Sequence, residues 1–279
     1  MSVKQRPRPS DSAGVPNKGL RVNSSKTYAN LAVTSNGNIF TVTLHRPPEN
    51  FLDEEMLIEL VDALEDLDGN DSCRVTILAS EGKHFCAGAN IAKRLADGQR
   101  RATHIYGHVP RLARIRKPIV ACVQGAAVGA GLGLALMADF RAATAGSRFS
   151  ANFNRQAYSP GFALTYTLPR VVGVQRASWL FYSGARIGGE EALRIGLIDR
   201  LSTSAHPGDA AVELATELAL SGPLAVQGTR ELLRQHFAAR VEAAIAEEMA
   251  LQDRLRETDD YVEGVQAMKE RRLPNFQGR

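Results

Sequence analysis

The chain has 279 residues, of which 44% are hydrophobic, and a formal net charge of +4. This is enough apolar material for a full core in one domain, but no apolar run is long enough to cross a bilayer. No basic stripe with interleaved aromatic residues is present, so we expect neither a nucleic-acid partner nor a membrane partner.

The N-terminal tail and the cysteines give information on the cellular compartment of the protein. Residues 1–25 are rich in Pro, Ser, Lys and Arg, lack the apolar core of a signal peptide, and are predicted to be a disordered tail. Cys73, Cys86 and Cys122 form a sparse, odd set, which favours a reducing compartment and a cytoplasmic location over a disulfide framework. No metal site is expected.

The periodic segments predict alternating strands and helices. Asn36-Gly37 between the β-rich runs 31–34 and 39–44 is a hairpin signal. Asp53 is a candidate N-cap for a helix that continues to about Leu67. Further strands are predicted at 75–79, 119–123 and 140–144, and further helices at 92–97, 103–115, 168–181, 189–195, 209–220, 223–240 and 241–253.

The stretch 118–139 joins a buried strand, through four glycines, to an uncharged helix. Such a junction presents free backbone N–H groups at the positive end of a helix dipole. It could be a dinucleotide loop, a site of close helix packing, or one half of an oxyanion hole. The spacing of Gly129, Gly131 and Gly133 does not match the dinucleotide pattern G-x-G-x-x-G, and an oxyanion hole needs a second donor.

Residues 83–91 supply a candidate for that second donor, since they form another small-residue loop after a predicted strand. Phe85-Cys86-Ala87-Gly88-Ala89-Asn90-Ile91, together with the segment Lys117–Gly131, resembles the enoyl-CoA hydratase/isomerase (crotonase) superfamily. The C-terminal segment from Asp260 resembles that family's last segment. The resemblance runs from about Tyr28 to the end of the chain.

The resemblance implies an α/β fold, a crotonase-type spiral of ββα repeats with a C-terminal helical region. Residues 26–205 would form the spiral core and residues 206–279 a helical trimerisation region. The expected assembly is a homotrimer or a dimer of trimers.

The resemblance also implies where an acyl-CoA substrate would bind. The backbone N–H groups of Ala89 and Ala130 would form the oxyanion hole. Coenzyme A would enter as part of the substrate, with no covalently bound cofactor. The positions that match coenzyme A contacts in the family are Lys83, Ala87, Ala89, Ile91, Arg271 and Arg272.

The chain departs from the family at the residues that carry hydration. Hydratases of the family use two glutamates, and the matching positions here are Gly133 and Phe153. The nucleophile position of the family's dehalogenases is Gly161. Gly133 and Phe153 predict an apolar pocket that could take a bulky acyl group, and Gly161 is a further candidate pocket residue. Candidate acid–base groups are Tyr158, Tyr106 and His104, in that order.

Three functions therefore stay open. The leading one is an enzyme of the lyase or isomerase class that stabilises a thioester enolate without simple hydration. The alternatives are a non-catalytic acyl-CoA-binding protein, and an acyl-CoA decarboxylase or C–C cleaving enzyme, in which bond cleavage itself generates the enolate.

Overall fold

The computed structural model describes residues 26–90 and 103–279, with side chains from Ile105 onward in the second range. The predicted tail, the predicted helix at 92–97, Ile91 and the side chain of His104 lie outside these described parts. No helix within them is long and apolar enough to span a membrane.

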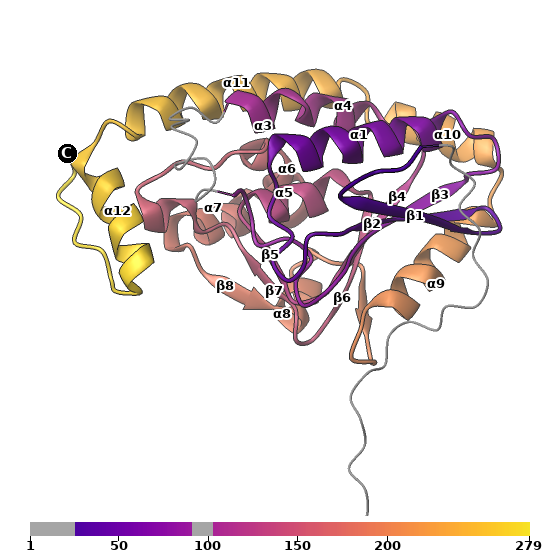
Figure 1. Ribbon diagram of the computed structural model, residues 1–279, viewed down its shortest axis with the longest axis horizontal. Helices are drawn as coiled ribbons and strands as arrows, with labels where there is room; N and C mark the ends of the chain where they lie inside the picture. Colours follow the sequence, from indigo (N-terminus) through magenta and orange to yellow (C-terminus); the bar gives the residue numbers. More distant parts are fainter. Residues whose placement is uncertain (1–25, 91–102) are drawn as a thin grey trace, which may run out of the picture.

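Two sheets form the centre of the molecule (Figure 1). The larger has the order β1-β2-β3-β4-β6-β9, with β1 and β2 antiparallel and the other pairs parallel. Its strands are β1 Leu31–Asn36, β2 Ile39–Leu44, β3 Val75–Ser80, β4 Ile119–Val123, β6 Phe140–Thr144 and β9 Arg200–Ser202. The smaller sheet contains β5 Ala126–Val128, β7 Arg148–Ser150 and β8 Arg186–Gly188.

The larger sheet is covered on both faces, which is why β4 is apolar along its whole length. Successive side chains of a strand point to opposite faces. Ile119, Ala121 and Val123 accordingly belong to the main core. Val120 and Cys122 belong to a second cluster on the other face, where α9 packs.

The helices that precede β9 in the chain lie around the sheets (Figure 1). They are α1 Glu54–Asp68, α3 Thr103–Gly107, α4 Val109–Arg114, α5 Ala130–Met137, the 3₁₀ helix η1 Asn152–Gln156, α6 Leu164–Val172, α7 Val174–Ser183 and α8 Gly189–Arg194. Asp53 caps α1 as predicted, because its side chain accepts a hydrogen bond from the Met56 N–H.

The C-terminal part is helical, and its longest helix lies along the outside of the molecule over α3 and α4 (Figure 1). Its helices are α9 Gly208–Ala219, α10 Pro223–Leu233, α11 Phe237–Leu255 and α12 Asp259–Glu270. The predicted division at 205/206 stays a prediction. The first helix beyond it, α9, packs on the sheet.

Three of the predicted helices are divided differently in the structure. The helix predicted at 103–115 is two helices, α3 and α4, with His108 between them. The helix predicted at 168–181 is two helices, since Gly173 lies between them with φ 78°. The break predicted between Arg240 and Val241 occurs earlier, where His236 adopts a left-handed conformation with φ 63°. Gly173, a poor helix former among three valines, marks the break within 168–181, whereas Leu233, Arg234 and Gln235 are good helix formers and do not mark the break at His236.

The residue Asp139, directly after α5, ties α10 to the core. Its carboxylate accepts from the Ile119 N–H at 2.9 Å. It also forms ion pairs with Arg230 of α10 and with Arg234, the residue that caps the C-terminus of α10, both at 3.0 Å. Because both arginines are largely buried, their charges depend on this carboxylate.

Candidate functional site

The two small-residue loops lie against each other at the start of α5. The Cys86 N–H donates to the Ala126 carbonyl at 3.0 Å, and the Val128 N–H donates to the Cys86 carbonyl at 3.1 Å. A Cβ at Gly131 would lie 2.2 Å from the Cys86 oxygen, so a glycine is required for this approach. The glycines therefore allow the close packing of the two loops, and the oxyanion-hole interpretation stays a prediction.

Each loop presents one backbone N–H that has no acceptor in the part of the chain that the structure describes. Ala130 is the first residue of α5, and Ala89 lies between two residues whose backbone groups bond to Leu52. Among the described residues, neither the Ala89 N–H nor the Ala130 N–H has an acceptor. Two such donors on adjacent segments, one at a helix N-terminus, suit an oxygen that gains negative charge.

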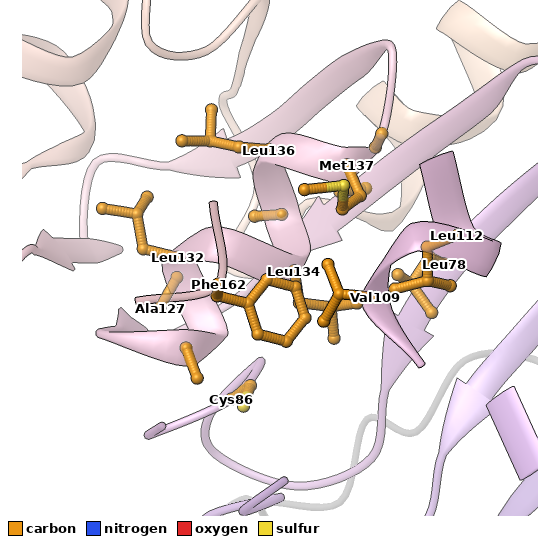
Figure 2. Packing of buried hydrophobic residues seen from close by; sticks show 14 of the residues in the cluster. Leu78, Cys86, Val109, Leu112, Ala127, Leu132, Leu134, Leu136, Met137 and Phe162 are labelled. Atoms are coloured by element: carbon orange, nitrogen blue, oxygen red, sulfur yellow. The ribbon is translucent and has the colours of Figure 1, made fainter. Parts of the chain in front are cut away.

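The Phe162 ring occupies the space beside Gly133. A Cβ at Gly133 would lie 2.7–2.8 Å from the Cδ1, Cβ and Cγ atoms of Phe162. Figure 2 shows this ring packed over α5, beside Leu134 and Val109. Phe162 therefore takes the space that a side chain at Gly133 would occupy, and the pocket for a bulky acyl group stays a prediction.

Of the other two predicted pocket residues, Phe153 lies close to the start of α5, and Gly161 lies against Tyr106. A Cβ at Gly129, the residue before α5, would lie 3.6 Å from the tip of the Phe153 ring. A Cβ at Gly161 would lie 2.1 Å from the Tyr106 hydroxyl, so this position has no room for a side chain. Aromatic side chains thus lie against Gly129, Gly133 and Gly161.

Tyr158 and Tyr106, both buried, are brought together by a residue that the sequence did not indicate. The Tyr158 hydroxyl donates to Oε1 of Gln252 at 2.7 Å, and Nε2 of Gln252 donates to the Tyr106 hydroxyl at 3.4 Å. Gln252 also bonds the carbonyls of Ser159 and Pro160. Arg256 donates to the Tyr158 hydroxyl, so a positive charge lies beside that oxygen.

Cys86 is not placed as a nucleophile. Its side chain is fully buried, and burial raises the pKa of the Cys86 thiol to about 12. The thiol contacts the Gly88 carbonyl at 3.7 Å. Residues 26–90 and 103–279 also hold no group of three His, Cys, Asp or Glu side chains that could bind a metal ion.

A comparison of the chain with known families settles its membership. The family model described as enoyl-CoA hydratase/isomerase matches residues 34–279. The chain belongs to the enoyl-CoA hydratase/isomerase family.

Relatives within the enoyl-CoA hydratase/isomerase family align over nearly their whole length. The chain is 33% identical to 2,3-dehydroadipyl-CoA hydratase of Escherichia coli K12 over 254 residues, which cover 89% of this chain and 99% of that protein. It is also 33% identical to (E)-benzylidenesuccinyl-CoA hydratase of Thauera aromatica over 242 residues, covering 85% and 94% of the two chains.

Solved structures of the family confirm the fold. An enoyl-CoA hydratase/isomerase from Pseudoalteromonas atlantica T6c superimposes with a TM-score of 0.81 at 27% identity, covering 89% of this chain and 100% of that one. The chain therefore has the crotonase-type α/β fold with a C-terminal helical region, as the motifs predicted.

The positions expected to contact coenzyme A are only partly available in this family member. Lys83 is exposed, and Ala87 and Ala89 are partly buried. Arg271 is exposed. Arg272, in contrast, forms ion pairs with Glu263 and Glu270 at 2.5 Å, so its charge is already balanced within the chain.

Sequence reasoning missed the buried polar residues of α11. The apolar face of that helix runs through Phe237, Val241 and Ile245 and continues with Glu248 and Gln252. Polar residues on a face that is otherwise buried were the available signal, because such groups need partners within the protein. Their partners lie 83 to 146 residues away along the sequence.

Proposed function

We propose that the chain binds an acyl-CoA thioester and stabilises its enolate with the N–H groups of Ala89 and Ala130. The observation that carries this proposal is the pair of unused donors on the two adjacent loops. When an enolate forms, electron density moves onto the thioester oxygen, and two fixed donors stabilise that charge more than the neutral carbonyl. The family membership supports the thioester as the substrate class.

The reaction we propose is not simple hydration. Adding water to an enoyl thioester requires a base to remove a proton from water and an acid to protonate the α-carbon. Gly133 and Phe153 provide neither group, and Phe162 fills the space beside Gly133. If an acid–base group acts here, Tyr158 is the first candidate, followed by Tyr106 and His104.

A second candidate is cleavage of a C–C bond, such as decarboxylation, and the aromatic surroundings favour it. The breaking bond would leave its electron pair on the α-carbon, so the enolate would form without removal of a proton. Carbon dioxide or a carbonyl fragment would leave, and solvent would later protonate the α-carbon. A non-catalytic acyl-CoA-binding protein would use the same donors without turnover.

We also propose the remaining features that the family resemblance implies. Lys83, Ala87, Ala89, Ile91 and Arg271 would hold coenzyme A as part of the substrate, while Arg272 would contribute less because of its ion pairs. The assembly would be a homotrimer or a dimer of trimers.

The deciding experiment is exchange of the α-proton of butyryl-CoA in deuterated water, followed by NMR. Exchange would mean that a base removes the proton and that the enolate then takes up a deuteron. The Ala130→Pro variant deletes one donor, and proline is tolerated at the first position of a helix. In Ala130→Pro we expect the exchange rate to fall about a hundred- to a thousandfold. The control Ala130→Ser keeps the N–H and should exchange at the wild-type rate.

Each outcome separates the candidates. Exchange that is lost in Tyr158→Phe would identify Tyr158 as the acid–base group. Binding without exchange, followed by turnover of malonyl-CoA, would favour C–C cleavage, and binding without any turnover would favour the non-catalytic protein. A lack of binding to any acyl-CoA would contradict the proposal.

A further inference from the structure

Glu248 is a buried carboxylate that holds the chain directly after Phe162. Its Oε2 accepts from the Ala163 N–H at 2.7 Å, and its Oε1 accepts from the N–H and hydroxyl of Thr165 at 2.8 and 2.7 Å. Only 4% of Glu248 is exposed, and burial raises the pKa of its carboxyl. The three hydrogen bonds partly compensate for that burial.

The backbone that Glu248 holds is strained. Phe162 and Ala163 are consecutive non-glycine residues in the left-handed region, with φ 64° and 56°. Side chains with a Cβ avoid this region, so it persists only where the surroundings impose it. Strain of this kind is concentrated at functional sites, so the side chain that this turn holds in place is of functional interest.

The strained turn positions the Phe162 ring over α5. The ring is fully buried, lies against Gly133, and packs edge-to-face on Tyr106 with centroids 6.4 Å apart. Gly133 is three residues after Ala130, so the two share a face of α5. The ring therefore fills the space on the face of α5 that Gly133 shares with Ala130, whose N–H is one of the two proposed oxyanion donors.

We propose that Phe162 determines acyl specificity by restricting the site to short acyl thioesters, and that Glu248 is the positioning residue that holds it there. This inference rests on the proposed function, because it assumes that the acyl group lies beside Ala130. Glu248 acts through the turn and does not touch the substrate. The resulting selection is for acetyl- or butyryl-sized groups over long chains.

The test measures the dissociation constants of CoA, acetyl-CoA, butyryl-CoA and octanoyl-CoA by calorimetry. In Phe162→Ala we expect octanoyl-CoA to bind about tenfold tighter, the gain from burying a few more methylene groups. Binding of acetyl-CoA should stay within about twofold, because its contacts do not reach the ring. Phe162→Leu should give a smaller shift and serves if the alanine variant does not fold.

Glu248→Gln tests the positioning role. Its amide NH₂ would face an N–H donor of the turn, so the turn and Phe162 should loosen and the preference should shift toward octanoyl-CoA. Since both changes act on one ring, their effects should not add in the double variant. Glu247→Gln, on the exposed face of the same helix, is the matched control, and Thr165→Val is the milder alternative.

Several results would overturn the inference. If Phe162→Ala binds all four ligands with the wild-type preference, Phe162 does not set specificity, although thioester binding would still support the proposed function. If Glu248→Gln lowers only the melting temperature, Glu248 has a structural role and does not position Phe162 for selection. If wild-type protein and variants bind no acyl-CoA, the proposed function fails together with the inference.

Discussion

At the scale of single residues, Cys86 shows how burial governs reactivity. It lies in the loop that carries the Ala89 donor, where a thiol could be mistaken for a nucleophile. Alkylating reagents react with the thiolate, and burial raises the pKa of this thiol to about 12. Cys122, also buried, has its pKa raised to about 12 for the same reason.

We therefore predict that Cys86 and Cys122 resist alkylation in the native protein at pH 8. Iodoacetamide should label them only as fast as the protein unfolds, and peptide mass spectrometry can locate the label. Protein in denaturant is the control and should be labelled at all three cysteines. Rapid labelling of native Cys86 would show that the thiol is accessible, and the nucleophile interpretation would have to be reconsidered.

At the scale of secondary-structure elements, α12 shows how a terminal helix is attached. A Cβ at Gly264 would lie 2.6 Å from the Gln156 backbone, so the glycine lets α12 approach η1 closely. Two residues beyond the helix bond to Glu263, which lies within it. Arg272 donates to the Glu263 carboxylate at 2.5 and 2.7 Å, and the Asn275 N–H donates to it at 2.8 Å. These contacts fold the end of the chain back onto α12.

The Glu263 contacts predict an acid-sensitive C-terminus. The hydrogen bonds from Arg272 and Asn275 lower the pKa of Glu263 from 4.5 to about 2. The pKa of Glu263 is lower in the folded protein than in the unfolded chain. The stabilisation is therefore fully present above pH 4.5 and is lost as the pH falls toward 2. Hydrogen exchange of residues 271–279 should therefore show more local opening at pH 2.5 than at pH 5, after correction for intrinsic exchange rates.

The matched variant for this prediction is Glu263→Gln. This variant should open the same segment at pH 5. The difference in corrected hydrogen exchange between pH 2.5 and pH 5 should therefore be smaller than in the wild type. An equal pH response in wild type and variant would assign the effect to other carboxylates.

At the scale of the whole molecule, exposed leucines gather around one helix. Leu224, Leu232 and Leu233 of α10 are 82%, 77% and 75% exposed, and Leu220, just before this helix, is 82% exposed. Single exposed leucines are ordinary, but several on one short segment indicate a surface that another protein covers. A second copy of the chain is the partner that the proposed trimer would supply.

We predict that replacing Leu232 and Leu233 together by glutamate dissociates the assembly. Light scattering after size-exclusion chromatography should then give a mass near the 30.2 kDa of one chain. The exposed Thr229→Glu variant adds charge to the same helix without removing apolar surface and should leave the assembly intact. A wild-type protein that is already monomeric would contradict the proposed trimer.

Local chemistry was sufficient to predict several features from the sequence. The Asn36-Gly37 hairpin, the Asp53 cap and the strand at 119–123 each depend on residues close together in the chain. The two loops were recognised because glycines mark the close backbone approaches, and the family membership followed from their motifs. The roles of Ala89 and Ala130 remain proposals, now supported by their unused N–H groups.

Only the tertiary structure decided what surrounds those loops. Glu248 reaches Ala163 across 85 residues and Gln252 reaches Tyr158 across 94, and no local periodicity encodes such pairs. The sequence by itself determined that Gly133 carries no carboxylate. That the Phe162 ring fills the space there depends on a left-handed turn held by a distant helix, because the partner that stabilises this strain is brought close only by folding.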